Sequence, residues 1–200
     1  MIFVVLDDLA RVAAASSSEE QKALPTPCGG FDVQGVRRHL TGGLTYFEGA
    51  FRDPDAGQRG ADPHHYSGPD ELDAILPRLS ATLRSALDSG VAAAVVNVSE
   101  LGGSFPGAMV VDMVLIEVIT HGWDLARAAG LPWEPADETS AHALAFYRQI
   151  IRPEWRGPGM AFDHEFPVEP NAAVLDRLVA FTGRDPNWSP KTAGHVGDRE

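Results

Sequence analysis

Apolar side chains recur at intervals of three and four residues along most of this 200-residue chain. That spacing places them on one face of an α-helix, whereas strict alternation would indicate β-strands. The clearest run follows Asp32, a residue type that often caps a helix N-terminus. Its apolar members are Val33, Val36, Leu40, Leu44, Phe47 and Phe51. Such segments must bury their apolar faces against one another, so the sequence predicts a mainly all-α fold.

The same periodicity, together with glycine and proline at the segment ends, predicts five further helices. They cover about residues 5–16, 72–87, 106–130, 137–151 and 171–183. Pro77 lies inside the second of these and predicts either a kink or a later helix start. Four of the predicted helices are long, which favours a four-helix bundle with ligand sites between facing helices.

The intervening segments predict little regular structure. Residues 94–98 favour a short strand or an extended connection, and the glycines and prolines of 102–107 favour a turn. We expect residues 1–200 to form one domain, with a loosely ordered polar tail at 185–200.

Composition narrows the partners and the compartment. The net charge of −12 argues against nucleic acid or an anionic membrane as a partner. A single cysteine, Cys28, excludes an internal disulfide scaffold. The opening residues MIFVVLDDLARVAAA lack the basic flank of a signal peptide, and no apolar run approaches the roughly 20 residues of a membrane span. We therefore expect a soluble, cytoplasmic protein.

Polar residues interrupt the apolar helix at VLIEVITHGWDLARAAG, residues 114–130. Glu117 and His121 are four residues apart, so their side chains project from the same face of a helix. A carboxylate oxygen and an imidazole nitrogen placed in this way can bind one metal ion. His39, in the middle of the helix that follows Asp32, is the best candidate for a third ligand.

Three protein ligands would leave a coordination position open, as in catalytic zinc sites. The same two-histidine, one-carboxylate set also suits iron(II), manganese or nickel. Asp124, one turn beyond His121, could accept a hydrogen bond from that histidine and fix its tautomer.

Each of these residues also has a structural interpretation. Glu117, Thr120, His121 and Asp124 could form the solvated stripe of an amphipathic helix. In that case Asp124 would be a surface residue paired with Arg127 or Arg156. The adjacent pair Gly42 and Gly43 indicates a need for space, either for a ligand or for a closely packed helix.

The other histidines and the cysteine carry weaker signals. Cys28 is interpreted as a small buried hydrophobe, although a helix N-terminus nearby could instead lower its thiol pKa. Trp123 is expected in the core. The remaining histidines are expected at the surface or in loops without a functional role: His64, His65, His142, His164 and His195.

Four segments resemble the DinB-like, mycothiol-dependent maleylpyruvate isomerase family, in the same order and over nearly the whole chain. They are TPCGGFDVQGVRRHL (26–40), EVITHGWDLARAAG (117–130), RGPGMAF (156–162) and LDRLVAFTGRDPNWSP (175–190). The last two are similar to the closing segments of short, single-domain members.

The resemblance implies an up-down-down-up four-helix bundle with a divalent metal, usually zinc, held by His39, Glu117 and His121. It also implies mycothiol as cosubstrate, either for isomerisation of maleylpyruvate or for thiol transfer to electrophiles. Phe31 stands where the family usually has tryptophan. The isomerase's extra C-terminal domain and its substrate-anchoring arginine find no match, which argues against maleylpyruvate as the substrate.

The resulting hypothesis is a metal-dependent thiol transferase or isomerase that acts on a small electrophile, as a monomer or homodimer. The alternative hypothesis is a non-catalytic metal- or ligand-binding module on the same bundle.

Overall fold

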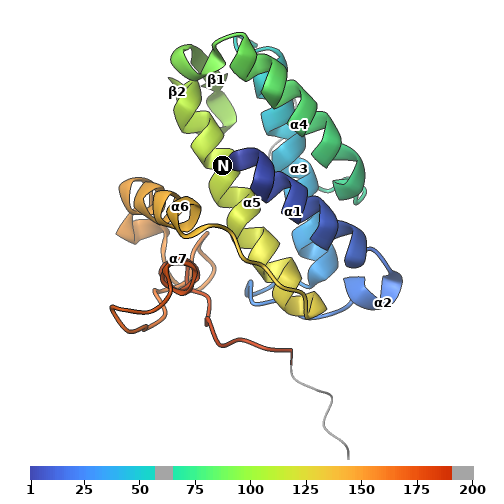
Figure 1. Cartoon of the computed structure of the whole chain (residues 1–200), viewed down its shortest axis with the longest axis vertical. Coiled ribbons are helices and arrows are strands. Elements are labelled where there is room, and N and C mark those ends of the chain that lie inside the picture. Colours follow the sequence, from blue (N-terminus) through green and yellow to red (C-terminus); the bar gives the residue numbers. More distant parts are fainter. Residues whose placement is uncertain (57–64, 191–200) are drawn as a thin grey trace, which may run out of the picture.

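The computed structural model describes residues 1–56 and 65–190 (Figure 1). Its α-helices are α1 (Ile2–Ala15), α2 (Glu19–Lys22), α3 (Val33–Arg52), α4 (Leu72–Asp88), α5 (Gly107–Ala129), α6 (Asp137–Ile150) and α7 (Val174–Phe181). Short 3-10 turns lie at η1 (Val91–Ala93), η2 (Ser99–Leu101) and η3 (Pro153–Trp155). A small antiparallel hairpin pairs β1 (Val95–Val98) with β2 (Gly103–Pro106). The prediction of a mainly helical fold is confirmed.

Helices α1, α3, α4 and α5 form a bundle around the apolar core (Figure 1). At one end, Arg37 near the start of α3 donates to the Ala13 carbonyl at the end of α1 and to Asp73 at the start of α4. At the other end, the Gly107 amide at the start of α5 donates to Ala94, a few residues after α4. Helices α1 and α5 therefore run in one direction and α3 and α4 in the other, which is the expected up-down-down-up arrangement.

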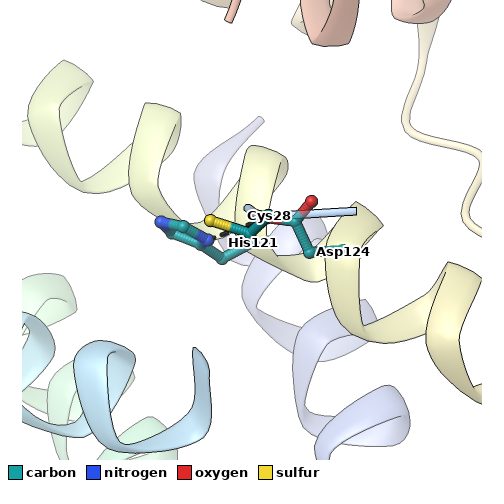
Figure 2. Close-up of side chains that lie close together, drawn as sticks. All are labelled: Cys28, His121 and Asp124. Atoms are coloured by element: carbon teal, nitrogen blue, oxygen red, sulfur yellow. Dashed lines mark hydrogen bonds and ion pairs between the residues drawn. The ribbon is translucent and has the colours of Figure 1, made fainter. Parts of the chain in front are cut away.

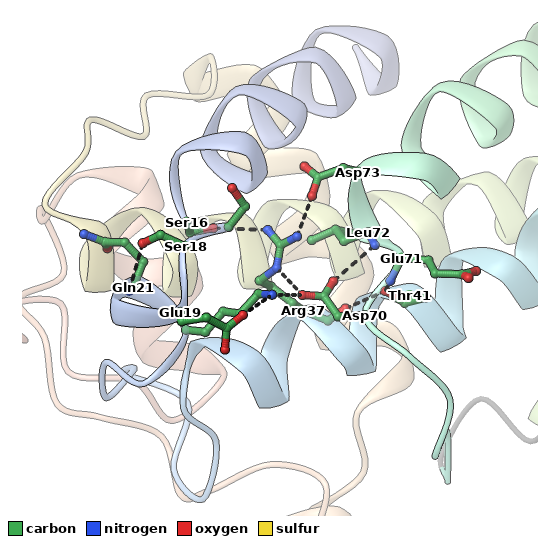
Figure 3. A network of polar contacts seen from close by, with 12 residues as sticks. Ser16, Ser18, Glu19, Gln21, Arg37, Thr41, Asp70, Glu71, Leu72 and Asp73 are labelled. Carbon is green, nitrogen blue, oxygen red and sulfur yellow. Dashed lines mark hydrogen bonds and ion pairs between the residues drawn. The ribbon is translucent and has the colours of Figure 1, made fainter.

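A buried arginine joins three of the bundle helices (Figure 3). Arg37 is 2% exposed, and its Nε and Nη2 donate to Asp70 and Asp73, each at 2.6 Å. Its Nη1 donates to the Ala13 carbonyl at 2.6 Å and lies 3.4 Å from the Ser16 hydroxyl. The guanidinium thereby compensates a carboxylate and a carbonyl that would otherwise be costly to bury.

Several predicted boundaries are wrong. Helix α1 begins at Ile2 and α7 only at Val174. Helix α4 begins at Leu72, so Pro77 lies inside it and does not delay its start. Proline removes one backbone hydrogen bond from α4. Burial of the apolar face of this helix, which includes Leu76 and Leu79, compensates for that loss.

The hairpin and the short helix α2 also depart from the prediction. Residues 103–106 form strand β2 where a turn was predicted, and the reversal is made by η2 together with Gly102 at φ +104°. Pro106 caps α5 and is not its first residue. No helix was predicted at α2, a single turn that is capped by the Ser18 side chain.

Other predictions are confirmed. Asp32 caps α3 by accepting a 2.7 Å hydrogen bond from the Gly35 amide, and Gly130, at φ +66°, ends α5. Trp123 is buried in the core. Helices α6 and α7 pack together beside α5 (Figure 1). Among the described residues, no helix has the length and apolar character needed to span a membrane.

The paired glycines of α3 differ in their surroundings. A Cβ on Gly42 would collide with the Tyr66 side chain, whereas a Cβ on the buried Gly43 would meet nothing within 4 Å. Gly42 therefore makes room for Tyr66 and not for a neighbouring helix, while space for a ligand beside Gly43 stays a prediction.

This difference predicts opposite effects of two adjacent substitutions. Gly43→Ala should stabilise the protein by about 0.5–1 kcal/mol, because alanine loses less backbone entropy in a helix. Gly42→Ala should destabilise it by about 1–3 kcal/mol through overpacking. Urea unfolding of both variants beside the wild type measures the two changes, and equal shifts in the same direction would contradict the assignment.

Candidate metal centre

Three side chains meet between α3 and α5. His39 comes from α3, and Glu117 and His121 come from successive turns of α5. His39 Nε2 lies 3.2 Å from Glu117 Oε2, and His121 Nε2 lies 3.8 Å from the same oxygen. The two imidazole rings meet edge to face with centroids 4.8 Å apart. The structure therefore brings together the trio selected from the sequence, while metal ligation by it stays a prediction.

The local structure explains how these side chains come together. The cap at Asp32 fixes the start of α3, and the buried residues Val36 and Leu40 orient the helix so that His39 lies at the edge of the core. On α5, Thr120 is buried and its hydroxyl lies 2.9 Å from that of Tyr147 on α6. Because Thr120 and Asp124 are both buried, the interpretation of this arc as a solvated stripe is wrong.

The donor atoms fit a divalent metal ion. Two ligand atoms at about 2.0–2.2 Å from a tetrahedral zinc lie about 3.3–3.6 Å from each other. The observed separations of 3.2 and 3.8 Å bracket that value. Part of the trio is also open to solvent, since the side chains of His39 and Glu117 are 28% and 33% exposed. A small molecule could therefore reach an ion bound there.

The protonation preferences of the trio are coupled. Burial opposes ionisation of Glu117, but the hydrogen bond and charge of His39 outweigh it and lower the Glu117 pKa to about 2. Burial likewise opposes a charge on His39, and the contact with Glu117 nevertheless raises the His39 pKa. Glu117 is therefore ionised, and its carboxylate could bind a metal ion together with the two histidines.

Behind the trio, Asp124 fixes His121. Burial lowers the His121 pKa, and the 2.9 Å contact of Nδ1 with Asp124 Oδ2 only partly offsets this, so the neutral imidazole is favoured. Asp124 is fully buried and is paired with Arg184, whose charge lowers the Asp124 pKa against the effect of burial. The predicted contact with His121 is present, and the alternative of a surface aspartate paired with Arg127 or Arg156 is wrong.

Cys28 lies beside this group (Figure 2). Its sulfur, a His121 nitrogen and an Asp124 oxygen all lie within 4.8 Å of one another, so these residues form a second possible ligand set. Both Asp124 oxygens accept hydrogen bonds from Arg184, which makes them poor ligands and favours the first trio. Burial raises the Cys28 pKa to about 11, which is the opposite direction from activation by a helix N-terminus.

The loop that carries Cys28 is held by Thr26. The Thr26 hydroxyl donates to the Phe31 carbonyl at 2.7 Å and accepts from the Cys28 amide at 3.2 Å. The loop also places the Phe31 ring 6.1 Å from the His39 ring, centroid to centroid, with 43% of the residue exposed. Phe31, which stands where the family usually has tryptophan, therefore lies next to a candidate ligand.

The remaining histidines in the described part of the chain lie away from the trio. His65, His142 and His164 are exposed, as predicted. His64 and His195 lie outside the described residues, as does most of the tail predicted at 185–200. Among the described residues, Arg184 contributes to the centre although the sequence analysis assigned it no role. The GRDP motif that contains it was available as a signal, but only the fold shows that it approaches Asp124.

Comparison with known proteins identifies the family of this chain. The sequence profile of the mycothiol maleylpyruvate isomerase N-terminal domain matches residues 4–126, which include all three residues of the trio. The chain belongs to this family. The match covers the four bundle helices almost completely, and it ends before α6 and α7.

Two relatives are similar to this chain beyond the bundle helices as well. The uncharacterized proteins MT0763 and Rv0738, from two strains of Mycobacterium tuberculosis, are each 28% identical to it over 176 residues. Each alignment covers 85% of this chain and 88% of the relative, so it must include residues beyond 126. No solved structure gives a significant match.

Proposed function

We propose that this protein is a divalent-metal-dependent enzyme that uses a low-molecular-weight thiol of the mycothiol type. The reaction would be thiol transfer to a small electrophile or isomerisation of one. The observation that carries this proposal is the convergence of His39, Glu117 and His121 on one partly open point between two helices. Family membership supports the connection with mycothiol.

The roles of the residues follow from the geometry. His39, Glu117 and His121 would hold the metal; the family resemblance makes zinc the first candidate, and the same donor set also suits iron(II), manganese or nickel. A metal bound there supplies a Lewis acid that lowers the pKa of a thiol reaching it. Asp124 orients His121, and the neighbouring Thr120 is buried with its hydroxyl against that of Tyr147 on α6.

A turnover assay tests the proposal. The zinc-loaded full chain is incubated with mycothiol and an alkylating electrophile, and separately with mycothiol and maleylpyruvate. We expect thiol-dependent acceleration of at least the first reaction, lost in His39→Ala and after chelation. Zinc and mycothiol binding without acceleration of either reaction would contradict catalysis and favour the non-catalytic binding module.

A further inference from the structure

Arg184 approaches the candidate metal centre from a segment outside the family's matched region. It follows α7, whereas the match ends at residue 126. We infer that Arg184 is a positioning residue of the metal centre, which acts through Asp124 to fix the metal-binding nitrogen of His121. This inference rests on the proposed function, because it concerns the same centre.

The first link is a buried ion pair. Arg184 Nε donates to Asp124 Oδ1 at 3.2 Å, and Nη2 donates to Oδ2 at 2.9 Å. The two side chains are 8% and 0% exposed. Two parallel hydrogen bonds from one guanidinium fix both the position and the plane of a carboxylate. The third guanidinium nitrogen donates to the Thr182 carbonyl at 3.2 Å, which holds the fork itself in place.

The second link passes from the carboxylate to the imidazole. Asp124 Oδ2 lies 2.9 Å from His121 Nδ1. An ionised carboxylate only accepts hydrogen bonds, so Nδ1 must carry the proton. The lone pair of the neutral ring then lies on Nε2, the nitrogen 3.8 Å from Glu117 Oε2. The orientation imposed by Arg184 thus decides which nitrogen His121 offers to a metal ion.

Local backbone structure delivers the guanidinium to this point. Gly183 adopts φ +91°, a conformation that side-chain-bearing residues rarely take, directly after α7. A Cβ at this position would also lie 2.7 Å from Asp163 Cβ. The chain therefore turns at glycine and directs the next side chain inward, so the segment beyond the bundle supplies part of the centre.

Zinc affinity tests the inference. We would measure it on the full chain by competition with a chromophoric chelator for wild type, Arg184→Met, Arg184→Lys and the control Arg156→Met. Arg156 lies between α6 and α7, also beyond residue 126, and donates to the Asp163 and Phe181 carbonyls, so its loss reproduces a local structural defect. Arg184→Met should weaken zinc binding about 10- to 100-fold, the usual effect of removing support behind a ligand.

The direction of the change in zinc affinity shows whether Arg184 acts by positioning Asp124 and His121 or only through its positive charge. Removing a nearby positive charge would by itself strengthen the binding of a cation. Arg184→Lys keeps the charge but not the planar fork, and we expect an intermediate loss. If Arg184→Met does not fold, this lysine variant decides the question. Zinc affinity within about twofold of wild type in every folded Arg184 variant would overturn the inference.

A second measurement is independent of the metal. In the metal-free protein labelled with ¹⁵N-histidine, NMR reports which nitrogen of His121 carries the proton. We expect the Nδ1–H tautomer in wild type and Arg156→Met, and a mixture in both Arg184 variants. An unchanged tautomer would overturn the inference. If the wild type binds no zinc, the proposed function fails, while this measurement still decides whether Arg184 positions His121.

Discussion

The Arg37→Met protein is expected to lose about 3–5 kcal/mol of unfolding free energy, the usual cost of removing one partner of a buried ion pair. Arg37 is 2% exposed and makes 2.6 Å contacts with Asp70, Asp73 and the Ala13 carbonyl (Figure 3). Methionine fills a similar volume but cannot donate. The substitution therefore leaves Asp70, whose side chain is 7% exposed, without its guanidinium.

Arg38 provides the matched control. It is the next residue on the same helix but is exposed, so Arg38→Met should change stability by no more than about 0.5 kcal/mol. Urea unfolding followed by circular dichroism measures both variants. Similar losses in the two proteins would mean that the network around Arg37 does not hold the ends of the helices together.

A second large effect is expected at the metal centre. His121→Ala should reduce zinc affinity by more than the roughly 100-fold that loss of a supporting residue costs, because it removes a ligand itself. The fold should be retained, since the His121 side chain is partly exposed and is not a member of the apolar core. Chelator competition gives the affinity, and circular dichroism confirms the fold.

His142→Ala is the control for that experiment. His142 on α6 contacts Asp112 on α5 at 2.7 Å, so it is also a histidine paired with an aspartate of α5, although it belongs to another helix. Its side chain is 45% exposed, and it belongs to neither of the two possible ligand sets. Zinc affinity should be unchanged in this variant. Wild-type affinity in His121→Ala would remove His121 from the proposed ligands.

The parts of the fold that depend on local sequence were predictable. The spacing of apolar residues located α3 and α5, and Asp32 and Gly130 located one end of each. Glu117 and His121 belong to one helix, so a separation of four residues was enough to place them together. His39 lies on a different helix; its position among the apolar residues of α3 made it the best candidate for a third ligand, and the family resemblance selected the same residue.

The parts that depend on tertiary packing were not predictable from local pattern. Arg37 and Arg38 are identical neighbours, and only the approach of α1 and α4 decides which one is buried. The pairing of Asp124 with Arg184 joins residues 60 positions apart. Of the β-hairpin, the strand alternative predicted for residues 94–98 is confirmed by β1, whereas β2 was missed because the glycines and proline of 102–106 resemble an ordinary turn until the two strands pair.

Metal analysis tests the central claim most directly. The full chain would be purified without a histidine tag or added metal, beside His39→Ala and His121→Ala, and its elemental content measured by mass spectrometry. We predict about one divalent ion, zinc first, per wild-type chain and its loss in both variants. No metal in the wild type even after reconstitution, or full retention in both variants, would contradict a metal centre at His39, Glu117 and His121.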